Sequence, residues 1–340
     1  MADIISFGEI MMRLQPPGFQ RFAQATSFDV VYGGGEANVA YSLAQFGMDA
    51  AFVTRLPNNP IGDSAIGELN RYGVDTSKIV RGGERMGIYF CEKGASVRAS
   101  KVVYDRKYAS ISTSAIEDFD WKNIFKGVKW FHFTGITPAL GGNLPEICLI
   151  ACKTAKELGV KVSCDLNYRK NLWTTAQAKE TMTKLMPFID LLIANEEDAE
   201  KVFGIKPDKN DISSGVLDIQ GYKDVAQKLV NTFGFKQVAI TLRESFSASK
   251  NGWSGLLYDN NAFYKAKRYD IDIIDRVGGG DSFGAGLIYA MLNGKDPQSA
   301  IEFAVAASAF KHTIEGDYNI VSVAEVETLA SGDASGRVQR

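Results

Sequence analysis

The stretch that decides the fold is DRVGGGDSFGAG, residues 275–286, in which three consecutive glycines stand directly before an aspartate. Glycine tolerates positive φ angles and lets backbone N–H groups approach a ligand closely. Apolar residues at helical spacing follow (Phe283, Leu287 and Met291), so a helix that begins here directs its dipole and its unpaired amides at the same point. The stretch predicts an anion site beside the carboxylate of Asp281. The structural alternative is a tight turn with Asp281 as N-cap.

The spacing of these glycines excludes two common nucleotide motifs. It fits neither G-x-x-x-x-G-K-S/T nor a G-x-G-x-x-G that follows the first strand with an acid about 20 residues later. An acid beside an anion site favours phosphoryl transfer instead. Backbone amides and a cation neutralise the phosphoryl charge, while Asp281 accepts the proton of the attacking hydroxyl.

The whole chain has the composition of a globular protein with a small-molecule partner. Its 340 residues are 45% hydrophobic and carry a formal net charge of -2, so no bulk basic field exists for nucleic acid or an anionic membrane. Residues 1–8 lack the features of a signal peptide, and no uncharged apolar run reaches about 18 residues, so we expect a cytoplasmic protein without a membrane span. With four cysteines, two histidines and no C-x-x-C pair, any metal should be a hard cation held by oxygen. Cys148 and Cys152 share a helical face, which favours core packing.

Short β-rich runs alternate with longer amphipathic ones. The predicted strands are residues 4–10, 51–56, 130–136, 160–166, 191–194 and 237–242, and the predicted helices are 36–46, 145–158, 176–188 and 222–233. This alternation predicts an α/β fold with a mostly parallel sheet covered on both faces, and ligands at the carboxyl ends of the strands.

Two segments interrupt the alternation. Residues 11–32 and 85–112 show strand patterns without helices between them, and we interpret them as antiparallel strands of a small sheet that serves as a lid. Residues 206–221 are predicted to be a surface loop and 331–340 a flexible tail, which leaves one domain over residues 1–330. A second glycine cluster, GGGEAN at 33–38, precedes a helix and would either bind sugar hydroxyls or form a structural turn.

Taken together, these motifs resemble the ribokinase-like (PfkB) carbohydrate kinases. GGGEANVA at 33–40 and residues 275–286 are similar to the two signatures of that family, and DLNYR at 165–169 and NEED at 195–198 fall where it has D-x-N-x-R and N-x-x-E. The resemblance spans nearly the whole chain. It implies a three-layer α/β/α Rossmann-like domain with a β lid, ATP and Mg²⁺ as cofactors, a monovalent cation as an optional further cofactor, and a homodimer formed through the lid.

The same resemblance implies roles for individual residues. Gly278, Gly279 and Gly280 would form the anion hole beside the base Asp281, and Gly34, Gly35 and Asn38 would bind the sugar. The implied nucleotide contacts are Asn195, Thr241, Arg243, Gly278, Gly280 and His312. Asp198 would act on magnesium through water, although it is a methylene shorter than the glutamate of the family. At 241–245, TLRES departs from the family's T-x-G-x-x-G, so either Arg243 reaches donor phosphate or the backbone takes another course.

The acceptor is expected to carry an acid. Arg13 stands where neutral-sugar branches of the family have an aspartate, which indicates an acidic substrate or, alternatively, a surface salt bridge. Tyr104 and Arg106 share a strand face and, with Tyr89, resemble the branch that phosphorylates 2-keto-3-deoxygluconate. Arg169 would join them, because a guanidinium can bind a carboxylate with two parallel hydrogen bonds. The alternatives are fructokinase or another neutral-sugar kinase and, from a different class, a non-catalytic sugar or nucleotide sensor.

Overall fold

The main sheet is built on six parallel strands. The computed structural model describes residues 2–207, 219–259 and 262–333, and within them nine strands form one sheet in the order β14-β13-β12-β11-β10-β9-β1-β4, with β15 paired to β13. The parallel strands are β1 (Ile4–Phe7), β4 (Ala50–Val53), β9 (Trp130–Thr134), β10 (Lys161–Asp165), β11 (Leu191–Ala194) and β12 (Gln237–Ser245). The predicted mostly parallel sheet is therefore confirmed. Sequence patterning did not predict the antiparallel extension, β13 (Lys250–Asp259), β14 (Ala262–Lys265) and β15 (Tyr269–Asp272).

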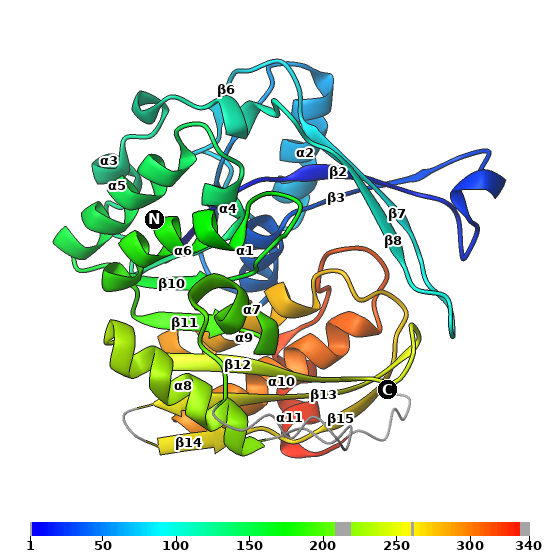
Figure 1. Cartoon of the computed structure of the whole chain (residues 1–340). Helices are drawn as coiled ribbons and strands as arrows, with labels where there is room; N and C mark the ends of the chain where they lie inside the picture. The colour runs from blue at the N-terminus through cyan, green and yellow to red at the C-terminus, as the bar shows by residue number, and fades with distance from the viewer. Residues whose placement is uncertain (1, 208–218, 260–261, 334–340) are drawn as a thin grey trace.

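Helices cover both faces of this sheet and make the three layers that were expected (Figure 1). One layer holds α3 (Trp121–Ile124), α4 (Ile136–Ala139), α5 (Leu144–Glu157), α6 (Thr175–Leu185), α7 (Glu196–Phe203) and α8 (Ile219–Phe233). The other holds α1 (Gly35–Gln45), α9 (Gly279–Leu292), α10 (Pro297–His312) and α11 (Val323–Ser331). A further helix, α2 (Pro60–Arg71), packs beside α1.

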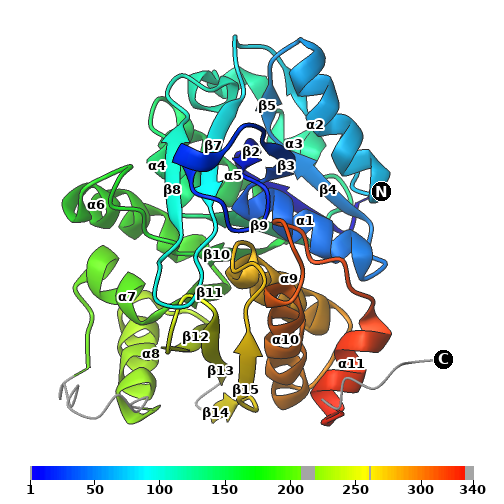
Figure 2. The same cartoon turned by 90° about the vertical axis from the view of Figure 1, so that its right-hand side faces the viewer.

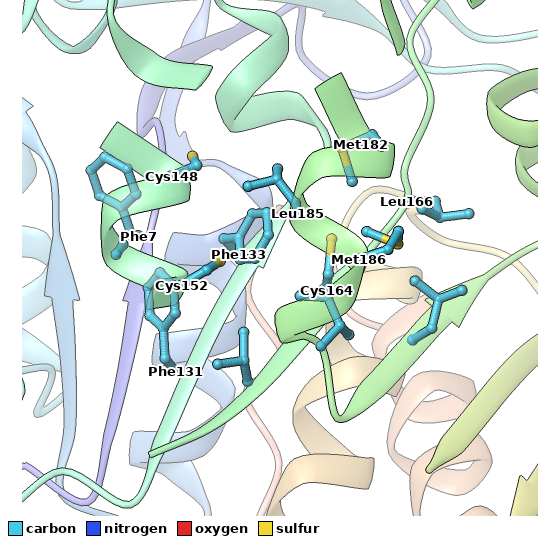
Figure 3. Packing of buried hydrophobic residues seen from close by; sticks show 14 of the residues in the cluster. Phe7, Phe131, Phe133, Cys148, Cys152, Cys164, Leu166, Met182, Leu185 and Met186 are labelled. Atoms are coloured by element: carbon cyan, nitrogen blue, oxygen red, sulfur yellow. The ribbon is translucent and has the colours of Figure 1, made fainter. Parts of the chain in front are cut away.

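Strand side chains alternate between the two cores because successive residues of a strand point to opposite faces. On β11, Leu192 packs with one helical layer and Leu191 with the other. The predicted core role of Cys148 and Cys152 is confirmed: both lie on α5 facing the sheet, and Figure 3 shows them beside aromatic side chains of the buried cluster. Burial raises the pKa of both thiols, so they remain neutral packing groups.

A separate four-stranded sheet projects from the main body at the right-hand side of Figure 1 and faces the viewer in Figure 2. Its order is β3-β2-β7-β8, with β2 (Met11–Gln15), β3 (Asp29–Gly33), β7 (Gly87–Glu92) and β8 (Lys101–Asp105). Each predicted segment forms an antiparallel hairpin, but the hairpins join through parallel pairing of β2 with β7. The expectation of a purely antiparallel small sheet was therefore wrong at this central pair. We call this sheet the lid sheet.

The predicted loop at 206–221 and the predicted tail at 331–340 lie only partly within the described residues. Of the predicted loop at 206–221, residues 208–218 lie outside the described residues, and its last three residues already belong to α8, which begins at Ile219. Ser331, the first residue of the predicted tail, is the last residue of α11, while 334–340 lie outside the described residues. Among the described helices, none is long and apolar enough to cross a membrane.

Candidate active site

A cavity of about 380 Å³ lies between the carboxyl ends of the parallel strands and the lid sheet. Its wall comes from the ends of β10, β11 and β12, the amino ends of α1, α7 and α9, and lid strands β7 and β8. Of the residues that the sequence suggested for the site, all except Arg13 line it: Gly34, Gly35, Asn38, Tyr89, Tyr104, Arg106, Arg169, Asn195, Asp198, Thr241, Arg243, Gly278, Gly279, Gly280, Asp281 and His312. The structure thus brings together segments that are far apart in the sequence, at the edge where an α/β sheet binds ligands.

The three glycines form the floor of the cavity at the amino end of α9. Gly278 is the N-cap with φ +85°, the left-handed conformation that glycine adopts most easily. The first intrahelical bond runs from Ser282 N to Gly278 O (2.9 Å), so the amides of Gly280 and Asp281 precede it. A Cβ on Gly279 would lie 2.5 Å from a ring carbon of His312, whereas a Cβ on Gly280 would meet open space. The floor is bare backbone at a helix amino end, which suits an anion.

Asp281 projects from the first turn of α9 into this cavity. The N-cap is Gly278, so the alternative that Asp281 merely caps the helix was wrong. Nδ2 of Asn38, on α1, donates to Oδ2 of Asp281 at 2.7 Å. Burial raises the pKa of Asp281 to about 7, and the Asn38 hydrogen bond opposes that rise, whereas the negative charges of Glu36 and Asp317 add to it. A carboxyl group in this range can take up and release a proton near neutral pH.

The lid contributes one cation and two tyrosines to the wall. Arg106 forms an ion pair with the buried carboxylate of Glu9, and its guanidinium carbon lies 5.2 Å from the ring centroid of Tyr104. Tyr89 is buried on the neighbouring strand and its hydroxyl donates to Asp317 at 2.5 Å. Of these side chains, Tyr104 is the exposed one. The predicted Tyr104 and Arg106 pair therefore does form one surface of the cavity.

Arg13 has neither of the roles expected for it. Its side chain is fully buried, with Nη1 2.7 Å from Oδ1 of Asp317 and Nη2 2.6 Å from Oδ2 of Asp275, and it also donates to Gln15. It does not line the cavity. Arg13 thus forms two internal ion pairs that connect lid strand β2 to Asp275, just before the glycines, and to Asp317. The expectation of a substrate contact and its alternative, a surface salt bridge, were both wrong.

The strand ends opposite the lid carry amide and carboxylate groups. Asn195 caps α7, accepting from the amides of Glu197 and Asp198 at 2.9 Å each. Asp198 is buried and accepts from Tyr168 N at 3.0 Å. Burial, together with the charges of Asp198 and Asp281, raises the pKa of Asp165 well above its usual value. Three carboxylates therefore converge on the end of β10 and β11.

Strand β12 runs without interruption through the residues that replace the expected glycines. Residues 241–245 pair with 251–255 of β13, so the backbone keeps its extended course. Thr241 and Arg243 alternate along the strand and both line the cavity, next to Arg276. Burial and the charge of Arg243 lower the pKa of Arg276, which donates to Ala248 O at 3.0 Å. Two guanidinium groups thus face this end of the cavity.

His312 closes the floor beneath the glycines as a neutral ring. Its Nδ1 donates to Ser308 O at 2.7 Å, and its ring centroid lies 4.9 Å from that of Trp253. Burial lowers its pKa to about 4. Its position fits a supporting group under Gly279 that carries no charge at neutral pH.

Five further charged residues line the cavity that sequence reasoning did not select: Glu9, Glu36, Asp165, Arg276 and Asp317. Arg276 lies inside the glycine stretch and Asp165 inside the DLNYR motif, so the sequence could have indicated both as site residues. Glu36 is buried beside Thr134 and Thr137, which donate to it at 2.8 and 2.6 Å. Glu9 and Asp317 had no local signal, because their partners come from distant parts of the chain.

Comparison with known proteins places this geometry in a family. Residues 1–323 match the model of the pfkB family carbohydrate kinases. The chain is similar to a 2-dehydro-3-deoxygalactonokinase of Haloferax volcanii (30% identity, 98% of each chain) and to a 2-dehydro-3-deoxygluconokinase of Bacillus subtilis (26% identity, 93% of this chain and 91% of that one). A crystal structure of 2-dehydro-3-deoxygluconokinase from Thermotoga maritima is 54% identical, with a TM-score of 0.93 over 97% of this chain and 98% of that one.

Proposed function

Because the chain belongs to the pfkB family of carbohydrate kinases, we propose that it transfers the γ-phosphoryl group of ATP to the terminal primary hydroxyl of 2-keto-3-deoxygluconate, also called 2-dehydro-3-deoxygluconate. The observation that carries the substrate assignment is the pair of arginines, Arg106 and Arg169, on the wall of the cavity that also holds Asp281. The names of similar proteins agree with a sugar acid as acceptor.

In this proposal Asp281 is the general base. Its carboxylate takes the proton of the terminal hydroxyl, the hydroxyl oxygen attacks the γ-phosphorus, and ADP leaves with the electrons of the broken P–O bond. Asn38 holds one carboxylate oxygen at 2.7 Å and so leaves the other for the substrate. The amides of Gly278 and Gly280 receive the negative charge of the phosphoryl group, as backbone donors at a helix amino end do, whereas the Gly279 amide donates to Arg276 O at 3.3 Å.

The acceptor binds between the lid sheet and the amino end of α1. Arg106 and Arg169 bind its carboxylate, Tyr104 covers it, and Gly34, Gly35 and Asn38 bind its hydroxyls. Gly35 suits this role because a Cβ there would lie 3.5 Å from Oδ1 of Asp281, on the path between sugar and base. Tyr89 shapes the pocket while its hydroxyl is held by Asp317.

The nucleotide lies at the opposite end, along β12 and α7. Thr241, Arg243, Asn195 and His312 line this part of the cavity, and Arg243 together with Arg276 offers positive charge to the donor phosphates. An anion between these guanidinium groups would relieve their mutual repulsion. This favours the first of the two expectations for Arg243, a contact with phosphate.

Magnesium fits as an ion carried in with ATP. Mg²⁺ is usually held by substrate phosphates, water and one or two carboxylates rather than by a dedicated cage of protein side chains. Asp198 would hold it through water, while Asn195, whose oxygen caps α7, would donate from its side-chain NH₂ to a phosphate oxygen. The bound ion would supply neutralising charge on the phosphates.

The alternatives are less well supported. The substrate of a fructokinase or another neutral-sugar kinase carries no carboxylate that Arg106 and Arg169 could bind. A non-catalytic sensor would not need a base with a pKa near neutrality beside the glycine floor. The galactonate and gluconate forms of the sugar acid differ in configuration at one carbon, so both belong in any test.

The test is an ADP-release assay with a panel of acceptors: 2-keto-3-deoxygluconate, its galactonate epimer, fructose and ribose, each with Mg-ATP. The expected result is turnover of a 2-keto-3-deoxy sugar acid with the highest kcat/KM. Faster turnover of fructose or ribose would overturn the substrate assignment, and no ADP release with any acceptor would support the sensor.

We further propose a cytoplasmic homodimer that forms through the lid sheet. Support comes from half-exposed and exposed apolar side chains on the face of that sheet turned away from the cavity: Leu14, Phe28, Val30, Phe90 and Val103. Such a surface on a projecting sheet is typical of an interaction site.

A further inference from the structure

The floor of glycines rests on a buried lysine that the proposed mechanism does not use. Lys311, in the last turn of α10, has 0% exposure. Its Nζ donates to Ile314 O at 2.8 Å and to Asp275 O at 3.5 Å, and its Cε lies 3.2 Å from the position that a Cβ of Gly278 would take. An ammonium group thus sits directly behind the N-cap of α9, on the side away from the cavity.

Lys311 lies beside a buried ion-pair group that has one negative charge in excess. Asp275 and Asp317 are both buried, and both bind the single guanidinium of Arg13. Two carboxylates and one arginine would leave one negative charge behind a loop that has to accept phosphate. The ammonium of Lys311 cancels it, and His312 next to it is neutral.

The position of Lys311 does not stabilise α9. A cation near the amino end of a helix opposes the helix dipole, so this charge costs α9 stability and favours an anion placed on the other side of the loop. Burial lowers the pKa of Lys311 to about 8, against the pull of Asp275 and Asp317, so the ammonium form is still the main one at neutral pH.

We propose that Lys311 is a built-in cation for the phosphate site: its ammonium occupies an oxygen-lined position behind Gly278, positions the glycine loop, and makes turnover independent of any added monovalent cation. This rests on the proposed function of the loop in binding the transferred phosphoryl group. The carbonyls of Asp275 and Ile314 are hard oxygen donors of the kind that also bind alkali cations. Removing the whole side chain should therefore leave a position that K⁺ or NH₄⁺ can fill.

A purely structural role makes a different prediction. Lys311 also lies at the carboxyl end of α10, where a cation and a donor to the last carbonyls stabilise a helix. If that were its whole contribution, its loss would lower the melting temperature and leave kcat and the KM for ATP unchanged.

The experiment compares wild type, Lys311→Met and Lys311→Ala, with Lys156→Met as control. Lys156 pairs with Asp190 at the far end of α5 and does not line the cavity. Kinase activity on whichever acceptor the wild type turns over, and the melting temperature, are measured in K⁺, NH₄⁺ and tetramethylammonium chloride at equal ionic strength. Using that acceptor keeps the test separate from the identity of the sugar.

Wild type and Lys156→Met should show the same kcat/KM in all three salts. Lys311→Met keeps the stem but not the charge, so kcat/KM for ATP should fall by roughly 10- to 100-fold in every salt. Lys311→Ala should fall similarly in tetramethylammonium and regain activity and melting temperature in K⁺ or NH₄⁺. A wild type that needs K⁺, or a folded Lys311→Met with normal kinetics, would overturn the proposal. If both variants fail to fold, the wild-type salt series still tests the proposal, because a requirement for K⁺ would overturn it.

Discussion

Burial raises the pKa of Asp281 from 3.8 to about 7, and the direction of that shift has consequences for stability as well as for activity. Between these two values the unfolded chain has the carboxyl ionised while the folded chain still holds its proton. Stability therefore falls as pH rises from about 4 to about 7, and the penalty is constant above that range. Burial of the Asp281 carboxyl thus lowers stability at neutral pH and, by raising its pKa, also makes it an effective base there.

Asp281→Asn should separate these two effects. We expect kcat to fall by roughly 10²–10⁴, the usual range for loss of a general base, while the variant gains stability at pH 8 of up to about 4 kcal/mol. The gain should largely vanish at about pH 3, where both states of the wild type are protonated. ADP-release kinetics and denaturant melts at both pH values measure this. Near-normal turnover would remove Asp281 from the role of base.

Arg106→Met tests the carboxylate contact. We expect kcat/KM for 2-keto-3-deoxygluconate to fall roughly tenfold to a hundredfold, with the loss in KM, because a charge-assisted pair is worth about 1.5–3 kcal/mol. Any neutral sugar that the enzyme accepts should lose far less. Arg106 is a cleaner probe than Arg169, because Arg169 lies within electrostatic reach of Asp281 and its loss would lower kcat for every acceptor.

Two controls sharpen that experiment. Arg85→Met removes a cation from the same lid sheet, but Arg85 pairs with Asp105 outside the cavity, so sugar kinetics should not change. The double variant with Glu9→Gln removes the buried carboxylate that Arg106→Met leaves unpaired. It should restore stability without restoring affinity for the sugar acid. An equal loss for acidic and neutral acceptors would show that Arg106 only supports the fold.

At the scale of elements, the sequence predicted what local periodicity encodes. Apolar runs located the six parallel strands, and the glycines with the apolar spacing after them located α9. The pairing of β2 with β7 was not predictable, because it joins segments whose patterns are each complete within a hairpin. Arg13 was misread for the same reason: its partners lie 262 and 304 residues away, and a lone arginine carries no sign of them.

Binding of the sugar acid should slow hydrogen exchange along whole strands of the lid sheet. All five residues of β8 are exposed, so this strand should exchange its amides rapidly in the free protein. If closure excludes water from the phosphoryl group, 2-keto-3-deoxygluconate should slow hydrogen exchange in residues 11–32 and 85–112 and leave α11 unchanged. Mass-spectrometric exchange with and without the acid measures this. Unchanged exchange in both segments would contradict a lid.

At the scale of the whole molecule, the sequence predicted which residues lie around the cavity better than it predicted the buried contacts that support them. The sixteen residues selected from the motifs line one cavity, because parallel strands bring their carboxyl ends to one edge. Two buried groups were not predicted, Asp317 in the cavity wall and Lys311 behind it. Their contacts depend on how the loop after α10 folds under the glycines, and no local pattern specifies that.

The outer face of the lid sheet leads to the last prediction, which concerns assembly. Val30 on β3 and Val103 on β8 are both more than half exposed, at opposite edges of a face on which Leu14 and Phe90 are half-buried between them. If two lids pack there, the double variant Val30→Glu/Val103→Glu would bury like charges against each other and should shift the protein from dimer to monomer. Light scattering after gel filtration measures the mass.

Leu158→Glu is the matched control, because Leu158 is about as exposed (50%) but ends α5, far from the lid. It should leave the mass at that of the wild type. Since the same sheet carries Arg106 and Tyr104 on its other face, loss of the partner should also loosen the acceptor pocket, so the monomer should show a raised KM for the sugar acid and a nearly unchanged KM for ATP. A wild type that is monomeric at micromolar concentration would contradict the dimer and leave the catalytic assignments, which rest on Asp281 and the glycine floor, untouched.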